Sequence, residues 1–124
     1  MTLNKIRHLT EQELKCLEEF AVFEVSLDQV RFCLRDVMKF GFDADGSEGE
    51  RWMEQNFVAP EPGLPITKWH IENALTKKRN LEISDKQLIE WATMLLMNHA
   101  YEFDKKNEDL IAEWLNDISF NLHP

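Results

Sequence analysis

The sequence predicts a single all-α domain of about five helices, built as two capped helix pairs, a long central loop and a C-terminal helix. Three observations support this prediction. The same helix-start signal occurs four times, apolar residues recur at helical spacing after each signal, and no alternating strand pattern persists along the chain. A length of 124 residues suits one domain and is enough to bury one core.

Each helix-start signal is a Ser or Thr between apolar residues, with a polar residue three positions later. The hydroxyl can accept a hydrogen bond from the backbone N–H three residues on, and a Glu or Gln at that position can reach back to the backbone of the cap. The flanking apolar pair forms a hydrophobic staple. The four signals are Leu9-Thr10…Glu13-Leu14, Val25-Ser26…Gln29-Val30, Ile66-Thr67…His70-Ile71 and Ile83-Ser84…Gln87-Leu88.

The helix starts occur in two pairs with nearly equal internal spacing, 16 and 17 residues. This spacing predicts helix pairs at residues 10–40 and 67–103. Duplication of an ancestral unit would explain the repeat, and so would one packing problem solved twice. The fourth helix has the widest apolar stripe and should lie at the centre of the core. Asn107 is expected to cap a C-terminal helix at residues 107–119.

The central segment, residues 41–65, is predicted to be a loop because it holds all four glycines and three of the four prolines. Residues 41–62 contain six acidic residues and one basic residue, and therefore carry −5 of the net charge of −9. Such a surface repels nucleic acid and attracts cations or basic proteins. The alternative is that it only keeps the domain soluble.

Part of this loop has the spacing of a calcium-binding loop. Oxygen-bearing side chains stand at positions 1, 3, 5 and 12 of such a loop, namely Asp43, Asp45, Ser47 and Glu54. Glu48, however, occupies the position where the sharp turn needs glycine. We therefore expect an acidic, turn-rich loop without a bound ion.

No other motif in the chain indicates catalysis or a cofactor. The four histidines and two cysteines lack metal-ligand spacing, and there is neither a glycine-rich phosphate loop nor a nucleophile elbow. We expect no metal, no cofactor and no catalytic residue, and hence a protein that is not an enzyme. Cys16 and Cys33 are expected to be buried free thiols, with a disulfide as the alternative. The lack of a long apolar run or a signal-peptide core favours a cytosolic protein that does not bind a membrane.

The second half of the chain carries motifs that suggest a relationship. These are "PIT…H…AL" in residues 65–75 and "EIS…QL…WA" in residues 82–92, followed by an acidic segment before a last short helix. On these motifs, residues 66–120 resemble a group of small acidic bacterial proteins of uncharacterised function. The resemblance implies a helical fold and a bacterial source, and it implies no activity. In size, acidity and helical content the chain is also similar to bacterial immunity proteins, the small antitoxins that bind secreted nucleases.

The function expected from these features is that of a non-enzymatic protein-binding module, most concretely an immunity-type inhibitor of a basic toxin. Clustered carboxylates would face Lys and Arg of the partner and speed association. The candidate binding residues are Asp43, Asp45, Glu48 and Glu50, with Trp52 and Phe57 as aromatic anchors. Core packing under the loop is the alternative for the two aromatic residues. The alternative functions are a homo-oligomeric structural protein and an enzyme without a recognisable motif.

Overall fold

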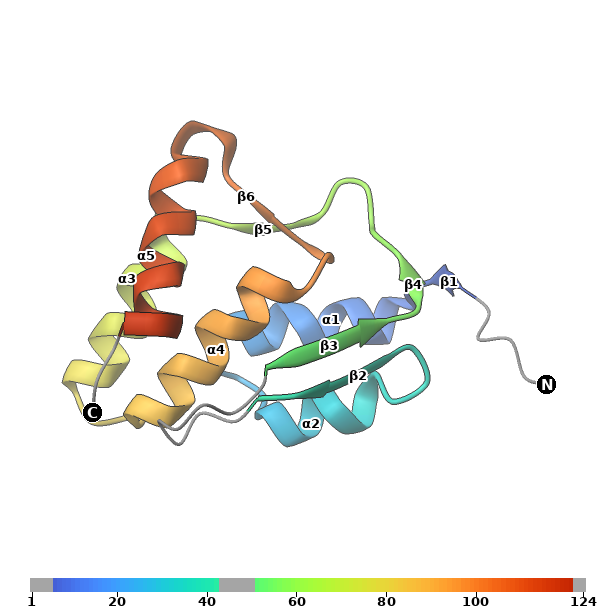
Figure 1. The fold of residues 1–124 in the computed structure, drawn as a ribbon, viewed down its shortest axis with the longest axis horizontal. Coiled ribbons are helices and arrows are strands. Elements are labelled where there is room, and N and C mark those ends of the chain that lie inside the picture. The colour runs from blue at the N-terminus through green and yellow to red at the C-terminus, as the bar shows by residue number, and fades with distance from the viewer. Residues whose placement is uncertain (1–5, 43–50, 122–124) are drawn as a thin grey trace.

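The computed structural model describes residues 6–42 and 51–121. Within these ranges the chain forms short strands, α-helices and one 3₁₀ turn (Figure 1). Their order is β1 Arg7–His8, α1 Glu11–Ala21, α2 Leu27–Cys33, β2 Met38–Gly41, β3 Trp52–Gln55, β4 Phe57–Val58, β5 Leu64–Ile66, α3 Lys68–Arg79, α4 Asp85–Met97, β6 Tyr101–Phe103, η1 Lys105–Asn107 and α5 Glu108–Asn121.

The prediction of an all-α fold is wrong, because strands accompany the helices. β2 and β3 form an antiparallel hairpin, whereas β1–β4 and β5–β6 are parallel pairs. These strands have only two to four residues, which is too short to produce a recognisable alternation in the sequence. Met38 and Phe40 are buried on alternate positions of β2, although the sequence assigned this segment to a helix. β3 and β4 lie in the segment predicted to be a loop.

The four predicted helix starts are confirmed. The Ser84 hydroxyl accepts from the Gln87 N–H at 3.1 Å, and the Gln87 side chain accepts from the Ser84 N–H at 2.8 Å. An equivalent pair of reciprocal hydrogen bonds caps α1, between Thr10 and Glu13, and α2, between Ser26 and Gln29. At the start of α3, His70 Nδ1 takes the reciprocal role, 3.0 Å from the Thr67 backbone nitrogen. Before α5, the capping side chain belongs to Asp104, which caps η1, rather than to the predicted Asn107.

The two helix pairs also share the turn between their helices. Phe23 and Leu81 occupy equivalent places after α1 and α3, with positive φ values of 64° and 61°. In each turn, the N–H of the following residue donates to a carbonyl five residues earlier at 2.8 Å. This is a Schellman ending, which usually has glycine at the positive-φ position. β1 and β5, the strands before α1 and α3, each form a parallel pair with a later strand. The sequence repeat is therefore a structural repeat.

The core is centred on α4, as the apolar stripe predicted. Leu88, Trp91 and Leu95 are almost completely buried, and Figure 1 shows α4 crossing the molecule between α1 and α5. Two buried hydrogen bonds join α4 and β6 to α1, from Trp91 Nε1 to the Ala21 carbonyl and from the Tyr101 hydroxyl to the Leu17 carbonyl. No helix in the described part of the chain is both long enough and apolar enough to cross a membrane.

Candidate functional site

The acidic residues predicted to bind a partner lie outside the described residues. They are Asp43, Asp45, Glu48 and Glu50. The first three ligand positions of the calcium-like spacing fall in the same segment, so the expectation that no ion binds there stays a prediction.

The two predicted aromatic anchors differ in exposure. Trp52 is 48% exposed on β3, directly opposite Gly41 of β2. A Cβ at Gly41 would lie 2.5 Å from the indole nitrogen, so glycine is needed for the ring to lie over β2. Phe57 is 8% exposed and belongs to the core cluster, which fits the core-packing alternative. Trp52 thus remains the anchor that a partner could reach.

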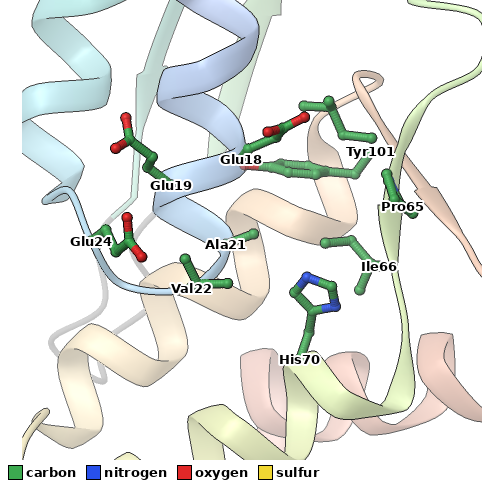
Figure 2. A pocket seen from close by; sticks show the side chains of 10 residues that line it. Glu18, Glu19, Ala21, Val22, Glu24, Pro65, Ile66, His70 and Tyr101 are labelled. Atoms are coloured by element: carbon green, nitrogen blue, oxygen red, sulfur yellow. The ribbon is translucent and has the colours of Figure 1, made fainter.

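A groove that the sequence did not indicate lies between the end of α1, the turn after α1, and β5. It encloses about 440 Å³ and is lined by residues from elements far apart in the sequence (Figure 2). The lining residues are Glu18, Glu19, Ala21, Val22, Glu24, Leu64, Pro65, Ile66, His70 and Tyr101. Among these described residues there are three carboxylates and no Lys or Arg, so the groove is acidic.

The position of these carboxylates is unfavourable for helix α1. Glu18 and Glu19 are in its last turn, which contains no basic residue, and Glu24 follows in the turn. The carboxyl end of a helix carries partial negative charge and is stabilised by basic side chains. Among the described residues, none of the three glutamates forms an ion pair. The equivalent helix α3 has the favourable arrangement, with Lys77, Lys78 and Arg79 in its last turn.

Tyr101 and His70 form neutral walls of the groove. The Tyr101 hydroxyl donates to the Leu17 carbonyl at 2.7 Å, and burial raises the pKa of this phenol well above its usual value. His70 Nδ1 accepts from the Thr67 N–H, which leaves the ring proton on Nε2. Burial lowers the pKa of His70, so the ring is neutral at pH 7. Neither residue offsets the charge of the glutamates.

The β5 wall is poorly suited to pairing with a strand from a partner. The Leu64 N–H and the Ile66 carbonyl both form hydrogen bonds toward β6. Pro65, between them, therefore directs its backbone to the outer edge, where it has no N–H to donate. A ligand in this groove would be recognised mainly through its side chains. Glutamates around an apolar floor suit the long stem and charged head of Lys or Arg.

The described residues offer little support for metal or thiol chemistry. Within residues 6–42 and 51–121, no group of three or more His, Cys, Asp and Glu side chains could hold a metal ion. Cys16 and Cys33 are free, with Cys16 buried and Cys33 half-buried. Burial, followed by the neighbouring Cys33, raises the pKa of the Cys16 thiol to about 12, so this thiol stays protonated at neutral pH.

The sequence did not indicate the groove because Glu18 and Glu19 belong to no recognisable motif. A signal was nevertheless present. Two helices with the same caps and the same turn end in opposite charges, and only the acidic end conflicts with the helix dipole. A scan against protein-family models, a search of curated proteins and a search of solved structures found no match to this chain.

Proposed function

We propose that this protein is a non-enzymatic module that captures a basic protein, most concretely an immunity-type inhibitor of a basic toxin. The observation that carries the proposal is the set of glutamates lining the groove at the end of α1, which form no ion pair with any described residue. The acidic segment at residues 41–62 adds negative charge to the same molecule, and the exposed Trp52 offers an aromatic contact.

Folding does not require acidic residues at this end of α1. Each charge placed against a helix dipole costs roughly 0.3–1 kcal/mol, and α3 solves the same packing problem with basic residues. The acidic residues at the end of α1 therefore lower the stability of the fold, and no structural benefit of their position is evident. A cationic partner would reverse that effect, because its charge would neutralise both the glutamates and the carboxyl end of the helix.

The groove suits one or two basic side chains. Ala21, Val22 and Ile66 provide apolar contacts for a Lys or Arg stem. Glu19 and Glu24 lie on the same side of the groove (Figure 2) and would receive the charged head. Interactions of this kind raise the association rate and weaken as salt is added. A toxin whose active surface binds a negatively charged substrate has basic residues of the type required.

The groove can be tested with an arginine-rich dodecapeptide as the probe, in an NMR titration at low salt. We expect shift changes concentrated at Glu18, Glu19, Glu24 and the adjoining part of β5. The triple variant Glu18→Gln/Glu19→Gln/Glu24→Gln should bind at least about tenfold more weakly, which is the order of an electrostatic focusing effect.

The matched control is Glu11→Gln/Glu108→Gln/Glu113→Gln, which removes the same charge from exposed positions outside both the groove and the acidic segment. It should bind the probe within about twofold of the wild type, because exposed single charges contribute little. Equal loss of binding in both triple variants would show that only net charge matters and would contradict the proposal. The toxin assignment is tested separately, by asking whether the protein blocks a basic toxin encoded beside its gene.

A further inference from the structure

Helix α3 carries apolar side chains on the side that faces solvent. Trp69 is 55% exposed, Leu75 is 42% exposed and Leu81, just after the helix, is 85% exposed. They are three of the eight exposed large apolar residues in the described part of the chain. Figure 1 shows α3 at the edge of the fold beside α5, where a neighbouring molecule could reach it.

The exposed residues of α3 form one continuous face. At 100° per residue, Trp69, Glu72, Leu75, Thr76 and Arg79 fall within an arc of about 120°, and all five are exposed. The equivalent helix α1 provides an internal comparison. Its exposed positions are all polar, namely Glu11, Gln12, Lys15 and Glu18. Since the same hairpin folds with a fully polar outer face in α1, the apolar residues on the outer face of α3 are not required by the fold.

The charges on this face can be satisfied by a second copy of the chain. Glu72 and Arg79 form no ion pair among the described residues. They are seven residues apart, or about 10 Å along one helix, which is too far for a close ion pair within α3. Lys77 and Lys78, in contrast, pair with Glu82 and Asp85 of the same chain. Residues 63–96 carry five bases and four acids in a chain of net charge −9, so two copies can approach here with little repulsion.

The order of residues along the chain is nearly symmetric about Leu75. Trp69 and Leu81 are each six residues from Leu75, while Glu72 precedes it by three residues and Arg79 follows it by four. In an antiparallel pair with its two-fold axis at Leu75, Glu72 of each copy lies within one residue, or about 1.5 Å along the helix, of Arg79 of the other, and Trp69 faces the turn that holds Leu81. A two-fold interface requires this self-complementary arrangement.

We propose that the protein forms a symmetric homodimer through antiparallel packing of α3 on α3. The contact covers the exposed Leu75 and pairs Glu72 with Arg79 across the axis. It uses a different surface from the acidic groove, so either proposal can fail without the other. A contact made by one helix from each copy is at the small end of specific interfaces, and the expected dissociation constant is roughly micromolar.

The oligomeric state can be measured by sedimentation equilibrium at loading concentrations from about 1 µM to about 500 µM. The wild type should pass from monomer to dimer in this range. Glu72→Arg and Arg79→Glu should each weaken the dimer at least about tenfold, because each places like charges across the axis. The double variant Glu72→Arg/Arg79→Glu should restore dimerisation. A structural defect within one chain would not be repaired in this way.

Leu75→Glu places two carboxylates at the axis and should give a monomer at all concentrations tested. The matched control is Phe32→Glu, which changes an exposed apolar residue on α2 and should dimerise like the wild type. Far-UV circular dichroism establishes that each variant is folded. A wild type that stays monomeric at every loading concentration overturns the proposal. The exposed face of α3 would then be available to a different protein. Failure of the double variant to restore the dimer overturns the antiparallel register.

Discussion

His70 makes one helix cap sensitive to pH near neutrality. Its Nδ1 accepts the Thr67 N–H at 3.0 Å and lies 3.2 Å from the Thr67 hydroxyl. A protonated ring carries a hydrogen on Nδ1 and can no longer accept from the backbone. Because burial lowers the pKa of His70 in the folded state, folding is favoured when the ring is neutral. Gln29 and Gln87 occupy the equivalent position in α2 and α4, and because an amide does not titrate, their caps do not depend on pH.

We predict that stability falls as the pH decreases through this histidine. The contribution of neutral His70 is fully present above the unfolded-state pKa of 6.5. It is lost as the pH falls from there through the lower pKa of the folded state, since the unfolded chain then binds the additional proton. Urea unfolding between pH 5 and pH 8 measures this change. His70→Gln should keep the cap, as Gln29 and Gln87 do in α2 and α4, and should flatten the profile. An unchanged profile in His70→Gln would contradict the assignment.

At the level of elements, the two turns have the same backbone and different surroundings. Phe23 stacks on Trp91 with ring centroids 5.3 Å apart, whereas Leu81 is 85% exposed. A non-glycine residue in the left-handed region costs roughly 1–2 kcal/mol. Stacking can offset that cost at Phe23, and nothing within the described chain offsets it comparably at Leu81.

Glycine at these two positions should therefore have opposite effects. Leu81→Gly should stabilise the fold by about 1 kcal/mol, since it relieves the backbone and removes little packing. Phe23→Gly relieves the same backbone but loses the stacking on Trp91, and should destabilise by about 2 kcal/mol. Both are measured by urea unfolding in the Leu75→Glu background, so that self-association does not enter. If both variants were more stable, the stacking of Phe23 on Trp91 would not offset the backbone cost, and if both were less stable, the turn at Leu81 would carry no such cost.

The elements that the sequence predicted are those with strong local signals. The caps at Thr10, Ser26, Thr67 and Ser84 could be located because hydrogen bonds over three residues leave a pattern in the sequence. The strands could not, because a strand as short as β4 is stabilised by its partner rather than by its own alternation. The positive φ of Phe23 and Leu81 was also not predicted, since such positions are recognised by glycine.

For the whole molecule, the candidate groove depends on contacts between distant segments. Glu18 reaches the same groove as Pro65 and Tyr101 only after α1, β5 and β6 have assembled. No local pattern in the sequence contains that information. The charge at the end of α1 was the one available signal, and it becomes informative only by comparison with α3. The sequence therefore predicts the acidic character of the protein and an acidic loop, but it does not indicate this groove.

The assembly of the two helix pairs rests on buried groups that each pair supplies to the other. The Ala21 carbonyl belongs to the last turn of α1, where carbonyls have no partner within the helix. It is buried away from water and accepts from Trp91 Nε1 of α4 at 3.0 Å. Helix α1 of the first pair thus ends on a hydrogen bond that only the second pair provides, which favours folding of both pairs as one unit.

Two substitutions at the boundary between the helix pairs should lower the free energy of unfolding by different amounts. Trp91→Phe should cost about 3 kcal/mol, because it leaves the Ala21 carbonyl unsatisfied and creates a cavity in the core. Tyr101→Phe should cost about 1 kcal/mol. The variant removes the hydroxyl that donates to the Leu17 carbonyl, but this carbonyl lies within helix α1 and keeps its partner in the helix.

Urea unfolding followed by both tryptophan fluorescence and far-UV circular dichroism measures the two losses. The two signals should coincide in the wild type and in both variants, since a contact shared between the halves prevents either from unfolding first. Separate transitions would show that the helix pairs are independent domains, and the larger cost at Trp91 would then have to arise within α4 alone.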